Sequence, residues 1–296
     1  MPVSPRRPPE LRGRFFRGSE VVARGLLTRT QLRSKAWRRL FRDVYVDAQL
    51  AVTHRTRCRA ARLVLPPGAA VAGRSAAALF GVGEVRVDEP IDVLVPTALR
   101  LGPVAGLTVH RADVTVDEIG SHASIPVTTP RRTCWDLAQW HPLEDAVAVV
   151  DRLASAGVVR LDDVADLARA RLGIRGGKRL LRVIKFADPG AESMPESRLR
   201  VRIVQAGLPR PVTQFVVERA GRFIARVDLA WPEHRVAVEY DGLWHHDPEQ
   251  FHRDRRRLNR LLGTDWLVLH VTAKRLRDDV DGFLVELRHA LATRRP

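Results

Sequence analysis

Two adjacent apolar stretches near the C-terminus decide the fold: FIARVDLAW at residues 223–231 and RVAVEYDG at residues 235–242. Both are rich in Val, Ile and aromatic residues, and the Pro-Glu-His segment between them is typical of a turn, so they predict two β-strands. Three carboxylates interrupt these strands: Asp228 in the first, and Glu239 and Asp241 in the second. Because an ionised carboxylate costs several kcal/mol to desolvate unless it is paired or binds a cation, this placement indicates a functional site.

Strand alternation determines which of these carboxylates share a face. Side chains two residues apart lie on the same face, so Glu239 and Asp241 point the same way. If the strands pair as a hairpin, Asp228 lies beside Glu239. Two or three carboxylates together with water are the ligands that Mg²⁺ prefers, and Mn²⁺ also accepts them. We therefore predict that Asp228 and Glu239 hold Mg²⁺ or Mn²⁺, which would activate a water and stabilise a phosphoryl transition state.

The rest of the C-terminal third predicts a mixed sheet with helices on its faces. The expected order is α-β-β-β-α-β-α: a helix from Ser193 to about Ala206, strands at 212–218, 223–230 and 235–241, a helix at about 248–262, a strand at 266–271 and a last helix at about 279–291.

Charge is concentrated at the other end of the chain. The net charge is +16, and residues 1–60 hold 15 Lys/Arg against 4 Asp/Glu, a net of +11, whereas residues 188–296 hold 19 against 16, a net of +3. A localised basic excess is typical of a polyanion-binding module, because each cation placed on a phosphate releases a condensed counterion. A solvated basic face is the alternative interpretation.

Composition narrows the class of protein. With 296 residues, 45% hydrophobic and 28% charged, the chain is long enough for two globular domains. It has no apolar stretch long enough for a membrane span and no signal-peptide core, so we expect no membrane partner. The two cysteines, Cys58 and Cys134, lie far apart and are expected to be reduced thiols in a cytoplasmic protein.

The basic N-terminal region resembles a winged helix-turn-helix. Thr28 followed by Gln31 predicts a capping box at a helix start. A second helix is expected from about Lys35 to Arg42, with a strand at 44–46 after it. In such a unit the second helix enters the major groove, so the predicted DNA-binding residues are Lys35, Arg38, Arg39 and Arg42.

Three regions are expected along the chain. Residues 1–70 form the basic winged-helix-like DNA-binding region, residues 71–187 an α/β and helical connecting module, and residues 188–296 the domain with the acidic site. The fold class is thus α/β (α+β) in two parts, an N-terminal winged helix with a small α/β module and a C-terminal mixed sheet flanked by helices. Short strands are expected at 91–95, 106–110 and 125–128, and helices at 133–139, 143–156 and 161–172.

The C-terminal residues carry a resemblance to a known superfamily. Asp228, followed after ten residues by Glu239-Tyr240-Asp241-Gly242-Leu243-Trp244-His245, is similar to the PD-(D/E)XK nucleases, and within them to the branch of very-short-patch-repair endonucleases. The resemblance covers about residues 190–280. It implies a restriction-endonuclease-like fold, with Glu196 on the first helix, Asp228 closing the second strand, and Asp254 and Arg257 on a later helix.

Two departures from the superfamily pattern bear on activity. Asp241 stands in the position of the superfamily lysine, and Val227 replaces the motif proline. We therefore predict that His245 serves as general base or proton shuttle, because imidazole titrates near neutrality. The implied catalytic set is Glu196, Asp228, Glu239, Asp241 and His245.

The N-terminal region has a looser resemblance, to AbiEi-type antitoxin domains. It rests on Leu27-Thr28-Arg29-Thr30-Gln31-Leu32, Val44-Tyr45-Val46, the segment 73–79 and the segment 126–133, over roughly residues 15–140. It implies DNA recognition.

The sequence thus predicts a DNA-binding, Mg²⁺-dependent endonuclease that hydrolyses phosphodiester bonds, in DNA repair or defence. The alternative is a non-catalytic DNA-binding regulator or antitoxin-like protein with a degenerate nuclease domain. RNA in place of DNA, and a homodimer in place of a monomer, stay open.

Overall fold

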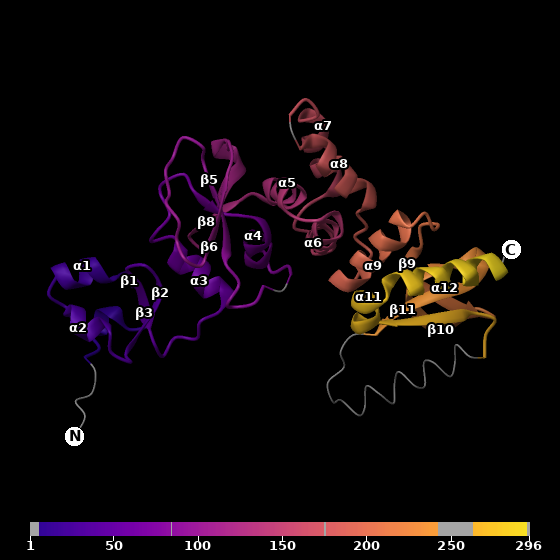
Figure 1. Cartoon of the computed structure of the whole chain (residues 1–296), viewed down its shortest axis with the longest axis horizontal. Helices are drawn as coiled ribbons and strands as arrows, with labels where there is room; N and C mark the ends of the chain where they lie inside the picture. Colours follow the sequence, from indigo (N-terminus) through magenta and orange to yellow (C-terminus); the bar gives the residue numbers. More distant parts are fainter. Residues whose placement is uncertain (1–5, 84, 175, 242–262, 295–296) are drawn as a thin grey trace, which may run out of the picture. The chain divides into compact units, whose positions relative to one another are not determined.

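The chain folds as two compact α/β units. A computed structural model describes residues 6–83, 85–174, 176–241 and 263–294 (Figure 1). The units are Met1–Trp140 and His141–Pro296. The predicted α/β class is confirmed. The sequence placed its main boundary near residue 188, whereas the contacts in the structure divide the chain after Trp140.

The first unit begins with a small antiparallel sheet and two short helices. Its elements are η1 (Pro9–Leu11), β1 (Phe15–Arg17), α1 (Gly18–Ala23), α2 (Arg29–Leu32), β2 (Trp37–Phe41) and β3 (Val44–Asp47), with sheet order β1-β3-β2. Thr28 caps α2: its Oγ1 accepts from Gln31 N at 3.2 Å, and Gln31 Oε1 accepts from Thr28 N at 2.8 Å. The predicted capping box is confirmed.

The predicted helix from Lys35 to Arg42 is wrong. Trp37–Phe41 is strand β2, which pairs with β3 through a turn at Arg42 and Asp43. The register shifts between Arg39 and Phe41. Such a bulge breaks strict alternation, so Arg38 and Arg39 are both exposed while Trp37 and Phe41 are buried. The spacing of these apolar residues imitates one face of a helix, which explains the error.

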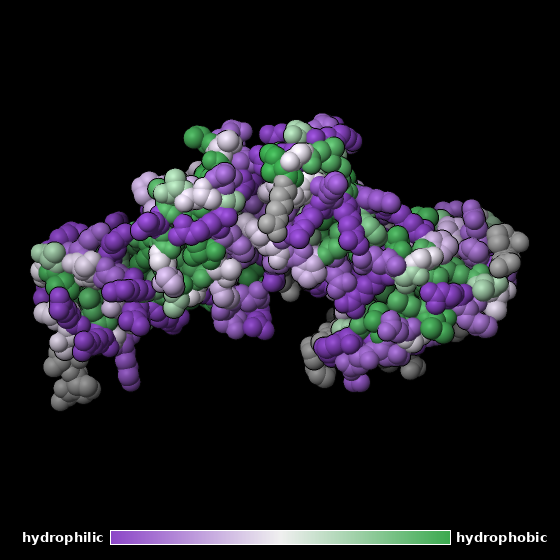
Figure 2. Space-filling model, turned by 45° about the horizontal axis from the view of Figure 1, so that its top comes forward, coloured by the Kyte–Doolittle hydropathy of each residue, from purple (hydrophilic) through white to green (hydrophobic). Residues whose placement is uncertain are grey.

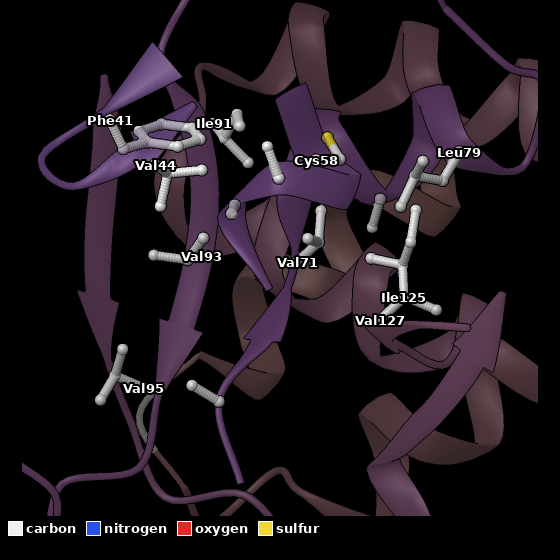
Figure 3. Close-up of a cluster of buried hydrophobic side chains, with 14 residues drawn as sticks. Phe41, Val44, Cys58, Val71, Leu79, Ile91, Val93, Val95, Ile125 and Val127 are labelled. Atoms are coloured by element: carbon white, nitrogen blue, oxygen red, sulfur yellow. The ribbon is translucent and has the colours of Figure 1, made fainter. Parts of the chain in front are cut away.

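A five-stranded sheet completes the first unit. Its elements are α3 (His54–Ala61), β4 (Ala70–Val71), α4 (Gly73–Leu79), β5 (Ile91–Val95), β6 (Leu107–Arg111), η2 (Val116–Glu118), β7 (Ile119–His122), β8 (Ile125–Thr128) and α5 (Pro130–Trp140), with sheet order β6-β5-β4-β8-β7. Figure 3 shows that Phe41 and Val44 of the β2–β3 hairpin join Cys58 of α3 and Val93 of β5 in one core. The hairpin and α3 are therefore parts of the same packed body.

The second unit combines a helical layer with a four-stranded sheet. Its elements are α6 (Leu143–Ser155), α7 (Leu161–Ala170), α8 (Gly177–Phe186), α9 (Met194–Gln205), β9 (Val212–Arg219), β10 (Arg222–Trp231), η3 (Pro232–His234), β11 (Val236–Asp241), β12 (Leu267–Thr272), α11 (Ala273–Asp278) and α12 (Val280–Thr293). The sheet order is β12-β11-β10-β9, antiparallel except for the parallel pair of β11 and β12. The predicted mixed sheet is confirmed; the predicted helix at 248–262, with Asp254 and Arg257, lies outside the described residues.

One face of this sheet forms the main core of the second unit. Leu199 and Ile203 of α9 and Phe283 and Leu287 of α12 pack against apolar side chains of β10, β11 and β12. On β11 these are Val236 and Val238, so the alternating residues Ala237, Glu239 and Asp241 are directed to the other face. The acidic residues are thus kept away from the α9–α12 core.

A buried ion pair fixes α9 to α6. Arg200 Nη2 lies 2.6 Å from Asp151 Oδ2, and both side chains are 0% exposed. Asp151 Oδ1 also accepts from Asp188 N at 2.7 Å, and Arg200 donates to the carbonyl of Phe186 at the end of α8. Helices α6 and α8 are therefore integral to the unit that carries the acidic strands.

Hydrophilic residues cover much of the face that Figure 2 shows, with smaller hydrophobic areas among them. Large exposed apolar side chains include Val212, Val216 and Phe223 on β9 and β10. In the described residues no helix is long and apolar enough to cross a membrane. Cys58 and Cys134 are both buried free thiols.

Candidate functional site in the four-stranded sheet

The candidate site lies where strands β10 and β11 separate. Their ladder runs from Trp231↔Val236 to Leu229↔Val238. At the next position the side chain of Asp228 bridges the two strands: its Oδ2 accepts from Tyr240 N at 2.8 Å. The carboxylate therefore lies against the strand that carries Glu239 and Asp241, as the predicted hairpin required.

Gln214 connects Asp228 to Glu196. Gln214 lies opposite Asp228 in the β9–β10 ladder, between the pairs Val227↔Phe215 and Leu229↔Thr213. Its Nε2 lies 3.0 Å from Glu196 Oε2 and 3.3 Å from Asp228 Oδ1. One amide group thus donates to two carboxylates that come from a helix and a strand.

His270 adds an imidazole to the same face of the sheet. It pairs with Glu239 in the parallel β11–β12 ladder, and cross-strand partners extend to the same side. His270 Nδ1 lies 3.3 Å from Asp241 Oδ1. Glu239 is only 4% exposed, while His270 and Asp241 are at the accessible end of the strands. Gln214, Asp228, Glu239 and His270 therefore form one row across the four strands.

Glu196 is held at the start of α9. Ser193 caps this helix by accepting from Glu196 N at 3.3 Å, and Glu196 Oε2 accepts from Glu192 N at 3.1 Å. Burial raises the pKa of Glu196 above its ordinary value of 4.5, and the negative charge of Asp228 raises the pKa further, against the opposing effect of hydrogen bonds that include the one from Gln214. A cation between these carboxylates would relieve that repulsion.

Replacing Glu196 by Gln should stabilise the metal-free protein at neutral pH. A carboxyl whose pKa is raised by folding binds its proton more tightly in the folded state, so its contribution to stability is greatest below 4.5 and is lost as the pH rises. Glu196→Gln has no carboxyl group to ionise at this position, so this loss of stability does not occur. Gln Oε1 can still accept hydrogen bonds. The difference in Tm between variant and wild type should therefore grow as the pH rises above 4.5, because the folded wild-type protein must ionise a buried carboxyl group.

Thermal unfolding with a chelator present measures this difference. The matched control is Glu218→Gln, because Glu218 is exposed on β9. The difference in Tm between this variant and wild type should not change with pH. A Glu196→Gln variant that is less stable than wild type at neutral pH would contradict the argument.

The residues present suit a hard divalent cation held by two protein ligands. All donors are oxygens, and each carboxylate has lone pairs left after its hydrogen bonds. Mg²⁺ keeps several waters and is usually bound through one or two carboxylates plus substrate phosphate, so Asp228 and Glu239 fit this pattern. Within the described parts of the chain, no group of three or more His, Cys, Asp or Glu side chains could hold a metal ion by itself.

The structure places four of the predicted residues around the end of the β10–β11 ladder. Glu196 and Asp228 share the amide of Gln214, Asp228 accepts from the strand that carries Glu239, and Asp241 lies 3.3 Å from His270. His245 lies outside the described residues. The sequence did not indicate Gln214 or His270. The signal for His270 was a polar residue inside the apolar strand Leu-Val-Leu-His-Val.

The predicted DNA-binding residues lie on the β2–β3 hairpin and the turn before it. Lys35, Arg38, Arg39 and Arg42 are all exposed. Asp43, in the hairpin turn, anchors the hairpin to α1, because its carboxylate accepts from Ser19 N at 2.8 Å and from Ser19 Oγ at 2.5 Å. The four cations therefore lie on, or directly before, a hairpin that Asp43 attaches to α1.

The fold and this site define an α/β chain with a basic first unit and an acidic row on the sheet of the second. Two Mycobacterium tuberculosis proteins are similar to it: uncharacterized protein MT2308 of strain CDC 1551 / Oshkosh and uncharacterized protein Rv2248 of strain ATCC 25618 / H37Rv. Each is 30% identical over 205 residues, which cover 69% of this chain and 74% of the relative. The chain belongs to the family of these mycobacterial proteins. No family model matches it, and no solved structure does.

Proposed function

We propose that the protein is a DNA-binding, Mg²⁺-dependent endonuclease. The observation that carries this proposal is the set of hydrogen bonds at the end of the β10–β11 ladder, where Gln214 joins Glu196 to Asp228 and Asp228 accepts from the strand that carries Glu239. Two carboxylates, from Asp228 and Glu239, would hold the cation. When bound, Mg²⁺ lowers the pKa of a coordinated water and neutralises charge on a phosphoryl group.

The remaining residues have distinct roles in this proposal. Gln214 orients the carboxylates of Asp228 and Glu196 through its two N–H groups, and Tyr240 N holds the second oxygen of Asp228. His270, positioned by Asp241, accepts the proton of the attacking water, because its imidazole is accessible at the end of the strands. This assignment gives His270 the part that sequence reasoning gave to His245.

Supercoiled plasmid tests the proposal. With Mg²⁺ or Mn²⁺ the wild-type protein should convert supercoiled DNA to nicked or linear forms, and a chelator should stop the conversion. Binding of the same DNA in the chelator, measured by electrophoretic shift, should persist, because DNA binding is assigned to the first unit. Equal conversion with and without chelator, or no conversion with either cation, would defeat the metal-dependent mechanism.

A non-catalytic DNA-binding regulator is the second candidate function. The observation that favours it is Asp241, which occupies the position of the superfamily lysine and has His270 as its neighbour at 3.3 Å. A regulator should bind DNA with the same affinity as its Asp228→Asn variant and cut nothing under any of these conditions. The same assay therefore separates the two functions.

A further inference from the structure

Helix α3 of the first unit carries a row of exposed arginines whose contacts in the described part of the chain are with uncharged groups. Arg55, Arg59 and Arg62 recur at intervals of four and three residues, which places them on one face of a helix. All three are exposed. Arg57, between them, is directed inward, where it donates to the carbonyls of Glu89 at 2.7 Å and Val87. The helix thus uses one arginine for folding and leaves three on its surface.

The partners of these three guanidinium groups leave their positive charges in place. Arg55 Nη2 lies 2.8 Å from His122 Nε2. Since arginine can only donate, the imidazole nitrogen is the acceptor in this contact. Arg59 lies over the ring of Phe15, 5.7 Å from its centroid, and Arg62 Nη1 donates to the carbonyl of Ser124 at 3.0 Å. Each side chain is therefore oriented by a neutral group.

A small pocket lies between the second and third of these arginines. It has a volume of about 230 Å³ and is lined by Phe15, Arg59, Arg62, Ala123, Ser124 and Ile125. The turn at Ala123 and Ser124 connects β7 to β8 and forms one wall. Two fixed guanidinium groups around a hollow of this size match a phosphate group, which arginine recognises through paired hydrogen bonds.

We propose that Arg59 and Arg62 bind a backbone phosphate of duplex DNA in this pocket, and that Arg55 continues the contact along α3. This rests on the DNA-binding half of the proposed function. From Arg55 to Arg62 the row extends by roughly 10 Å at 1.5 Å per residue, whereas phosphates of one strand recur about every 3.4 Å along the duplex axis. The row is long enough to meet more than one phosphate. Because it contacts backbone and no base edge, it contributes affinity without sequence preference.

The test is the salt dependence of binding to a short duplex, measured by fluorescence anisotropy with the full chain in a chelator. Each phosphate contact contributes a slope of about −0.9 to log K against log salt. The double variant Arg59→Gln, Arg62→Gln loses the one phosphate that both arginines hold, so it should bind more weakly, with a slope shallower by about 1. Arg59→Lys, Arg62→Lys keeps both charges and should keep the wild-type slope. Circular dichroism of each variant checks the fold.

A second double variant separates a local site from a general charge effect. Arg100→Gln, Arg131→Gln removes two exposed arginines from the same unit and should leave the slope within about half a unit of wild type, because neither side chain is assigned to a phosphate. The proposed phosphate site would be contradicted by an equal loss in both Gln variants, or by an unchanged slope in Arg59→Gln, Arg62→Gln. Either result leaves the proposed function standing as long as the wild-type protein binds DNA. No binding by wild type would overturn both. Cleavage plays no part in the readout.

Discussion

Asp228→Asn should slow Mg²⁺-dependent cleavage of DNA on the order of 100-fold and leave the fold intact. Asn Oδ1 can still accept from Tyr240 N, so the contact that joins the two strands is kept, whereas the charge that would hold the cation is lost. If metal-assisted catalysis contributes about 3 kcal/mol through this ligand, the rate should fall on the order of 100-fold. Initial rates of plasmid nicking measure the loss.

The control for this experiment comes from the same hairpin. Glu233 is an exposed carboxylate in the connection between β10 and β11, and Glu233→Gln should nick plasmid at the wild-type rate. Glu239→Gln should behave like Asp228→Asn. An Asp228→Asn variant that keeps its fold and cuts within about threefold of wild type would remove Asp228 from the metal site, since that change is under 1 kcal/mol.

Arg200→Met should be the most destabilising substitution in the second unit. It leaves Asp151 buried without its ion-pair partner, and loss of one partner from a buried pair costs about 3–5 kcal/mol. Urea unfolding at neutral pH measures the cost. Arg198→Met is the matched control: Arg198 pairs with Asp145 at 2.7 Å, but both side chains are about one-third exposed, so its loss should cost under about 1 kcal/mol.

The same variant has a predictable pH dependence. Burial raises the pKa of Asp151 above its ordinary 3.8, and the positive charge of Arg200 opposes that effect. Without Arg200 the pKa rises further, so the folded variant takes up a proton as the pH falls. The deficit in unfolding free energy should therefore shrink toward acidic pH. A deficit that is constant with pH would show that Arg200 contributes through packing alone.

Local signals in the sequence were sufficient for some of the fold. Thr28 and Gln31 lie three residues apart, so their capping box needs no distant contact. The strands around Asp228 and Glu239 could be recognised from their alternation and from the short turn between them. Residues 37–41 were misassigned because a β-bulge and an amphipathic helix produce similar spacing of Trp, Leu and Phe, and only the pairing of β2 with β3 distinguishes them.

The two site residues that the sequence did not indicate can be identified only from the order of the strands in the sheet. Gln214 and His270 are partners of Asp228 and Glu239 only because β9 and β12 are the outer neighbours of β10 and β11. Strand order is set by packing between segments distant in the chain, and no local pattern encodes it. For the same reason the sequence could not show that Asp151 of α6 is the buried partner of Arg200 in α9.

The side chain of Asp228 joins β10 to β11 beyond the last pair of their ladder, and this affects how the family can diverge. Under the proposed function, the same carboxylate would both join the strands and hold the cation. A relative without nuclease activity would still need an acceptor for Tyr240 N, so we expect Asp or Asn at this position in active and inactive relatives alike. Divergence of function should be visible first at His270 and Asp241, which contact each other and, among the described residues, accept from no backbone N–H of β10, so we expect these two positions to separate active from inactive relatives.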